Sequence, residues 1–266
     1  MPRLLKLPEG CYKSGFQTAM MTPTDAQRLA QRVQPDSPVV MKQEWSHLLF
    51  LHWEMDPAII QEQLPPGLTV DTYDGKAYLG IVPFHMDNVR PSFCPTVPGL
   101  SWFLELNLRT YVHDENGVPG VWFFSLDCNQ WLAVKLARGL FHLPYQHASM
   151  ESYQHDGILN YISRRKGCEQ SQIFKYPAEL SHSEAAEVGS LEFFLLERYR
   201  LFSVGANGSI YSGLVHHSPY QFQEIDITDY STRMFSLCGF DEPTSPPASS
   251  LIAETAHVNI HPLKKN

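Results

Sequence analysis

Residues 103–112 read FLELNLRTYV, and apolar and polar side chains alternate along this stretch. Because successive side chains of a β-strand point to opposite faces, the leucines of the stretch share one face. The other face carries, in chain order, Phe103, Glu105, Asn107, Arg109 and Tyr111. The pattern therefore predicts a strand on which an acid, an amide, a guanidinium and a phenol stand in one row, with neighbours about 6.5–7 Å apart.

Short β-type runs flank this strand on both sides. KAYLGIVPF (76–84) precedes it and GVWFFSLD (120–127) follows it, joined to it by an Asp-Glu-Asn-Gly turn that suits a hairpin. Further strands are expected at 39–53, 209–217 and 251–263 (the last as an edge strand), helices at 58–64 and 129–142, and either type at 190–204. Many short strands with turns between them predict a mainly β fold with a few short helices, built on a closed or strongly curved antiparallel sheet.

The chain divides into an extension and one domain. Residues 1–37 are interpreted as an N-terminal extension that carries a short helix at 26–33, with Thr24 or Asp25 as its cap. The sequence Pro35-Asp36-Ser37-Pro38 follows this helix and breaks the chain. Residues 38–266 contain no internal repeat and are expected to form a single β domain.

Composition limits the classes of function. The 266 residues are 43% hydrophobic and 18% charged, which predicts a folded chain. Twenty Lys and Arg against 28 Asp and Glu give a net charge of −8, so nucleic acid is not an expected partner. No continuous apolar run reaches the ~18 residues of a membrane span, and no signal peptide is recognisable, so no membrane partner is expected. The five scattered cysteines favour reduced thiols and a cytoplasmic location.

Motifs for cofactors and metals are missing from the sequence. It contains neither GxGxxG nor GxxxxGK[ST], which are the usual nucleotide signatures. The twelve histidines include no HExxH spacing and no neighbouring cysteine cluster that would indicate zinc. A serine hydrolase is unsupported because GxSxG is absent. We therefore expect no cofactor and no metal.

The polar row of residues 103–112 has two interpretations. If it faces water, it is an ordinary solvated strand face. If the sheet is closed, the row lines the interior and offers a polar pocket. Enclosed, Glu105 would need a partner, and Arg109 is the nearest one on the same face. A buried pair of this kind is costly unless it is fully hydrogen-bonded, which makes it more often functional than incidental.

A second candidate segment is RGLFHLPYQHASM (138–150). Helix, proline and extended exit are expected to place Tyr145, His147 and Ser149 on one side of the departing chain. A tyrosine can act as an acid and a histidine exchanges protons near neutral pH. The alternative is that Tyr145 packs as an aromatic lid over the helix end. Lys135 lies on a helix face with other polar groups, which is typical of a solvated face rather than of a desolvated Schiff-base lysine.

Several motifs together resemble one known family. They are FLHWEMDP, LPPGLTVDTYDGKAYLGIVPF, FLELNLRTYV, GVWFFSLD, ARGLFHLPY, LERY and GLVHH, and they cover roughly residues 40–263. In this order they resemble the YqjF-like bacterial family, a domain of unknown function (number 2071) that is grouped with the acetoacetate decarboxylase-like fold. The resemblance implies a mainly antiparallel, cone-shaped closed sheet around a central cavity.

The resemblance also implies a change of chemistry. Acetoacetate decarboxylases form a Schiff base on a lysine that lies in a Pro-Lys-Lys sequence after an arginine-bearing helix. The matching positions here are Arg138, Pro144, Tyr145 and Gln146. A phenol cannot form an imine, so the decarboxylase mechanism is not expected to carry over.

Other positions of that family depart in the same direction. The arginine that holds the substrate carboxylate matches Gln43 or Glu44, and one of the two pocket glutamates matches Gly80. The second glutamate is retained as Glu105. Arg109 is a candidate for anion binding, since a guanidinium grips a carboxylate through two hydrogen bonds.

Three hypotheses of function follow. The first is a polar pocket for a small anionic or carbonyl-containing metabolite, in which Glu105 and Tyr145 are catalytic, as in a lyase or decarboxylase without a Schiff base. Its ligand-binding residues would be Asn107, Arg109, Tyr111 and His147. The second is a non-catalytic module that binds or senses a small molecule. In the third, side chains fill the interior and the protein acts through its surface. A homo-oligomer is left open.

Overall fold

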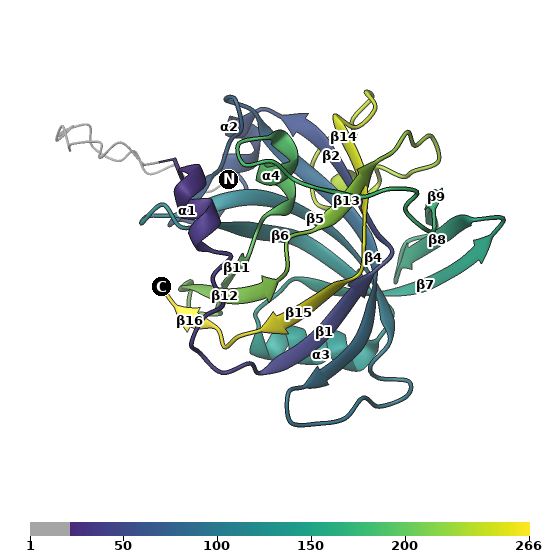
Figure 1. Cartoon of the computed structure of the whole chain (residues 1–266), viewed down its shortest axis with the longest axis horizontal. Helices are drawn as coiled ribbons and strands as arrows, with labels where there is room; N and C mark the ends of the chain where they lie inside the picture. The colour runs from purple at the N-terminus through teal and green to yellow at the C-terminus, as the bar shows by residue number, and fades with distance from the viewer. Residues whose placement is uncertain (1–21) are drawn as a thin grey trace, which may run out of the picture.

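The computed structural model describes residues 22–266, which form a mainly β structure (Figure 1). The helices are α1 (Asp25–Ala30), α2 (Pro57–Gln61), α3 (Trp131–Leu140), α4 (Leu191–Leu196) and α5 (Met234–Leu237). The strands are β1 (Met41–Ser46), β2 (Leu48–Met55), β3 (Leu68–Val70), β4 (Ala77–Pro91), β5 (Phe103–Asp114), β6 (Pro119–Cys128), β7 (Tyr145–His155), β8 (Ile158–Arg165), β9 (Gln172–Pro177), β10 (Glu184–Ala185), β11 (Arg200–Val204), β12 (Ile210–His217), β13 (Gln221–Glu224), β14 (Ser249–Ala253), β15 (Ala256–Ile260) and β16 (Lys264–Lys265).

Seven of these strands form a closed ring in the described part of the chain. Their order is β4-β1-β15-β12-β11-β6-β5, and β5 pairs with β4 to close the circle. Neighbours in the ring run antiparallel except β11 and β6, which are parallel. The predicted mainly β, closed-sheet fold is therefore confirmed, with parallel pairs that the sequence patterns did not predict.

Two strands are long enough to pair with different partners along their length. The first residues of β4 pair with β2, and its last residues pair with β1. Likewise the first half of β6 pairs with β11 and its last residues with β7. The sheet therefore continues beyond the ring as β2-β14-β13-β10 on one side and as β7-β8-β9 on the other (Figure 1).

Apolar side chains form two main cores, one inside the ring and one outside it. The inner core includes Phe84, Val121 and Val215, which face the ring interior. The outer core packs Leu106 and Leu108 of β5 against side chains of β8, β9 and α5. Because both faces of β5 are buried, its polar row lies inside the protein, as the closed-sheet alternative predicted.

Two segments, 190–204 and 251–263, show how the predicted elements compare with the observed ones. The ambiguous segment 190–204 contains both types of structure, since Ser190 caps α4 and β11 follows. The segment 251–263 was expected as one edge strand, which is wrong. It contributes the end of β14 and all of β15, and β15 lies between β1 and β12 within the ring.

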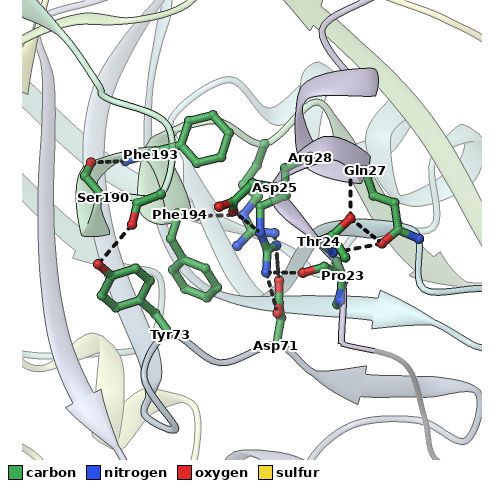
Figure 2. Close-up of polar contacts among 12 residues, drawn as sticks. Pro23, Thr24, Asp25, Gln27, Arg28, Asp71, Tyr73, Ser190, Phe193 and Phe194 are labelled. Atoms are coloured by element: carbon green, nitrogen blue, oxygen red, sulfur yellow. Dashed lines mark hydrogen bonds and ion pairs between the residues drawn. The ribbon is translucent and has the colours of Figure 1, made fainter.

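Helix α1 is attached to the domain by a buried ion pair (Figure 2). Thr24 and Gln27 form a reciprocal capping box at its start. Arg28 then donates two hydrogen bonds, of 2.5 and 3.0 Å, to the carboxylate of Asp71. The same carboxylate accepts a bond of 2.8 Å from Arg198, so α1 is linked to the chain that follows α4. None of the helices described between residues 22 and 266 combines the length and apolar character needed to cross a membrane.

Candidate functional site

The ring encloses a cavity of about 500 Å³. Strands β1, β4, β5, β6, β11, β12 and β15 contribute to its wall, together with α3 and the loop of residues 92–102. Most of the lining side chains are apolar, and a few polar groups interrupt them. The polar pocket expected from the strand row is thus a mainly apolar cavity with isolated polar groups, because the neighbouring strands supply Phe, Met, Leu and Val.

The cavity opens between α3 and the 92–102 loop. Leu136 and Leu140 of α3 line the cavity, and their exposed fractions are 52% and 64%. Val97 and Leu100 of the loop also line the cavity and are exposed to solvent. The opposite end of the ring lies near α1 and α4 (Figure 1). There the lining side chains, such as Leu196 and Tyr220, are buried. The cavity therefore has an apolar mouth and a closed base.

Glu105 and Tyr145 form a buried acid–phenol pair in the cavity wall. The Tyr145 hydroxyl donates a hydrogen bond of 2.6 Å to Oε2 of Glu105. Oε1 of Glu105 accepts a longer bond of 3.3 Å from the Asn107 amide. The exposed fraction is 3% for Glu105 and 8% for Tyr145, so both groups are shielded from bulk water. The two catalytic candidates, separated by 40 positions in sequence, are in direct contact.

Burial raises the pKa of both Glu105 and Tyr145. It raises the pKa of Glu105 from an ordinary 4.5 to about 7, against the opposing effect of the hydrogen bonds from Tyr145 and Asn107. Burial and the adjacent charge of Glu105 raise the pKa of Tyr145 well above its ordinary value. Near neutral pH, Glu105 therefore exchanges between acid and carboxylate while Tyr145 stays a phenol.

The end of α3 and the start of β7 position Tyr145. Helix α3 ends at Leu140 with Phe141 as its C-cap, and β7 begins at Tyr145, directly after Pro144. Nε of Arg138 donates a hydrogen bond of 2.6 Å to the carbonyl of Tyr145, which ties the helix to the strand. On the other side, the Tyr161 hydroxyl donates a bond of 2.7 Å to the backbone carbonyl of Glu105. Both backbones of the pair are thus fixed by side chains from other elements.

Arg109 does not pair with Glu105, which overturns the predicted ion pair. Its Nη2 donates to the Tyr111 hydroxyl at 3.2 Å and to the Leu195 carbonyl at 3.1 Å. Its guanidinium lies 5.2 Å from the Phe50 ring centroid. The reason is geometric. Glu105 and Arg109 are four residues apart on one strand and are therefore separated by about 13 Å, whereas side chains from facing elements lie closer to each of them.

The other predicted ligand-binding residues have different positions. Asn107 and Tyr111 are buried and are not among the residues that line the cavity, and they bond to Glu105 and Arg109 respectively. His147 is exposed on β7 and does not line the cavity. His147 therefore drops out of the candidate site, because β7 turns its side chain to solvent two residues after Tyr145.

Sequence reasoning missed three of the arginines that line the cavity, namely Arg90, Arg198 and Arg200. Arg198 lies between α4 and β11, and Arg200 is the first residue of β11; both line the cavity. Arg198 is 6% exposed and bonds to Asp71. The available signal was a Glu-Arg-Tyr-Arg sequence inside the apolar run FFLLERYRLF, since charges in such a run become buried.

Gln43 and Gly80 are positions matched to the decarboxylase-like family, and Lys135 is the helix lysine that was interpreted as solvated. Gln43 lines the cavity, and its amide oxygen accepts a bond of 2.9 Å from the Trp45 indole. A Cβ at Gly80 would lie 2.8 Å from Cδ2 of His52, so the ring of His52 occupies the space of a side chain there. Lys135 is exposed, with its amine 4.8 Å from the Trp131 ring centroid.

Within residues 22–266, none of the side chains that line the cavity is a lysine. The same part of the chain contains no group of three or more His, Cys, Asp or Glu side chains arranged to hold a metal ion. The charged side chains that do line the cavity are Glu105, which is hydrogen-bonded to Tyr145, and four arginines. They can donate and accept protons and bind an anion.

The fold is similar to that of several solved enzymes. Acetoacetate decarboxylase from Legionella pneumophila subsp. pneumophila str. Philadelphia 1 is 12% identical with a TM-score of 0.58, and the match covers 97% of this chain and 98% of that one. The enduracididine biosynthesis enzyme MppR, complexed with pyruvate, is 14% identical with a TM-score of 0.58 over 94% of this chain and 93% of that one. An acetoacetate decarboxylase-like enzyme from Sphingomonas wittichii RW1 is 13% identical with a TM-score of 0.56, over 86% and 94%. At these identities the likeness extends to the fold alone.

Sequence similarity gives the family. Residues 42–256 match the model of DUF2071, described as an uncharacterized conserved protein. The uncharacterized protein YqjF of Bacillus subtilis (strain 168) is 37% identical over 231 residues, which are 87% of this chain and 94% of that protein. Since both matches extend over most of its length, the chain belongs to the DUF2071 family and has an acetoacetate decarboxylase-like fold.

Proposed function

We propose that this protein binds a small carbonyl- or carboxylate-containing molecule in the ring cavity and exchanges a proton with it through Glu105 and Tyr145. The observation that carries the proposal is the hydrogen bond of 2.6 Å between these two buried side chains in the cavity wall. A cavity of about 500 Å³ also lies within the range of ~300–1,000 Å³ that is usual for ligand sites.

The chemistry rests on the different acidities of the two groups. A pKa of about 7, raised by burial, lets Glu105 give or take a proton near neutral pH, as a general acid or base requires. The Tyr145 phenol keeps its proton and can donate a hydrogen bond to a ligand oxygen or to Glu105. The pair can thus remove a proton beside a carbonyl while the phenol stabilises the developing charge on oxygen.

The proposal does not include an imine intermediate. Tyr145 stands at the position that the family resemblance assigns to the decarboxylase lysine, and a phenol cannot form a Schiff base. The exposure of Lys135 on α3 supports the same view, because a Schiff-base lysine needs a desolvated site.

A direct test uses the full chain with a panel of small keto acids and aldehydes. Proton exchange at the carbon beside the carbonyl, followed by NMR in deuterated water, should be catalysed by the wild type and lost in Glu105→Gln. The exposed Glu169→Gln variant is the matched control and should retain the activity. Full activity in Glu105→Gln would remove Glu105 from the mechanism.

Borohydride treatment in the presence of the same keto acids tests the excluded chemistry. We expect no covalent adduct by mass spectrometry. A reduced adduct on any lysine would contradict the proposal and restore a Schiff-base mechanism.

A non-catalytic binding module is the second candidate. The mainly apolar wall favours it, because a ligand held chiefly by apolar contacts need not react. This candidate predicts a ligand that raises the melting temperature and is recovered unchanged. Detection of any product would exclude it.

The cellular setting is part of the proposal. Cys94, Cys128, Cys168 and Cys238 are free thiols, which suits a reducing, cytoplasmic location. We propose a small molecule as the partner rather than nucleic acid or a membrane, since the chain has a net charge of −8.

A further inference from the structure

The charges around the cavity are unbalanced. Four arginines line it within residues 22–266, namely Arg90, Arg109, Arg198 and Arg200, against a single acid, Glu105. The chain as a whole carries a net charge of −8, so this positive excess is local. A cavity of this kind attracts an anion.

Two of the arginines stand together beside one aromatic ring. The guanidinium carbons of Arg109 and Arg198 lie 5.6 and 5.0 Å from the centroid of the Tyr111 ring. Both side chains are more than nine-tenths buried, with exposed fractions of 8% and 6%. They come from β5 and from the α4–β11 connection, so two separate elements bring these cations to the same place.

Neither guanidinium is fully satisfied by the described residues. Nε of Arg109 and Nη2 of Arg198 are buried without a hydrogen-bond partner. Arg198 has one carboxylate, that of Asp71, which it shares with Arg28. Arg109 bonds only to the Tyr111 hydroxyl and the Leu195 carbonyl. A buried guanidinium without a carboxylate is unfavourable, and an anionic ligand would supply the missing partner.

The arginine pair and the acid–phenol pair lie at different depths. In the sheet, Glu105 of β5 lies opposite Cys128 at the end of β6, and the chain after Cys128 leads directly to α3 at the mouth. Arg109 is four residues further along β5, about 13 Å away by strand rise, and contacts the end of α4 at the base. The route from mouth to base therefore passes exposed leucines, then Glu105 and Tyr145, then Arg109 and Arg198.

From this order we infer that the ligand is a carboxylate with an extended apolar body. Its carboxylate would bind Arg109 and Arg198 at the base, and its body would run past Glu105 and Tyr145 towards the leucines of α3. This inference rests on the proposed function, because it uses the same cavity, and it names the class of ligand. A keto acid of three or four carbons would leave most of a cavity of about 500 Å³ empty.

Calorimetry on the full chain tests the inference with three probes: octanoate, the uncharged octanamide, and acetoacetate. We expect octanoate to bind at least tenfold more tightly than either of the others, since only octanoate combines the anion with the apolar body. Arg109→Gln should weaken octanoate at least tenfold and leave octanamide unchanged. Arg164→Gln, which removes an exposed arginine on β8, is the matched control and should bind octanoate like the wild type.

The outcomes separate this inference from the function on which it rests. Octanamide binding as tightly as octanoate would remove the anion subsite. Acetoacetate binding more tightly than octanoate would overturn the inference and leave the proposed function standing. If none of the three probes binds, the inference is also overturned, while the keto acid and aldehyde panel still decides the proposed function. If Arg109→Gln does not fold, the wild-type comparison of octanoate with octanamide decides alone.

Discussion

Replacing Glu105 with Gln should change how the stability of the protein depends on pH. Burial raises the pKa of Glu105 from 4.5 to about 7 in the folded protein. Between these two values the folded state holds a proton that the unfolded state has released. Stability is therefore lost as the pH rises from 4.5 to about 7. At about 1.36 kcal/mol per pH unit, this interval corresponds to about 3 kcal/mol.

The assay is urea unfolding of wild type and Glu105→Gln between pH 4.5 and 8.5. We expect the free energy of unfolding of the variant to gain about 3 kcal/mol relative to wild type across this range. Other groups cancel in this difference. His85, for example, has a pKa lowered by burial to about 4 in both proteins, and its contribution falls as the pH falls.

Glu169→Gln serves as the control, because that carboxylate is exposed, and its curve should run parallel to the wild type. The reasoning is refuted if the difference between wild type and Glu105→Gln stays constant with pH. It is equally refuted if the variant loses stability relative to wild type as the pH rises.

Three further predictions concern single contacts. Tyr145→Phe removes the hydrogen bond that lowers the pKa of Glu105, so the loss of stability with rising pH should extend above about pH 7. The free energy of unfolding should also fall by about 1–3 kcal/mol. An unchanged pH dependence in urea unfolding would contradict this prediction. Gly80→Ala places a Cβ 2.8 Å from the ring of His52. This overpacking should lower the free energy of unfolding by about 1–3 kcal/mol and with it the melting temperature. An unchanged melting temperature would show that the His52 ring moves freely. Arg28→Gln removes the charged hydrogen bonds from α1 to Asp71 but leaves Arg198 as a partner of that carboxylate, so it should cost about 1.5–3 kcal/mol in urea unfolding. Proteolysis near α1 should also be faster. Wild-type stability would mean that the Arg28–Asp71 pair contributes nothing.

The membership of the polar row was predictable because strand alternation alone decides which side chains share a face, whereas the direction of that face depends on closure of the sheet. Alternation along 103–112 puts the odd-numbered side chains on one face, and the ring turns that face inwards. The partners of those side chains were not predictable in the same way. Glu105 bonds to Tyr145, which the fold brings from a distant segment, and not to Arg109 on its own strand.

The period of 129–142 predicted the helix but not its surroundings. Leu132, Leu136 and Leu140 do share a face of α3, yet this face borders the cavity mouth rather than a solid core. Hydrophobic periodicity predicts that one face of a helix is apolar but does not predict what that face contacts. Arg198 was missed for a related reason, because a charge inside an apolar run gains a meaning only when its long-range partners are known.

The placement of β15 has a consequence for biosynthesis. Residues 256–260 complete the ring by pairing with β1 near the start of the domain and with β12. While a ribosome is still translating the chain, the circle stays open, and β1 exposes an unpaired edge until residues 256–260 emerge. We therefore expect the nascent polypeptide to depend on chaperones late in translation, and a premature stop before residue 256 to yield an aggregation-prone product.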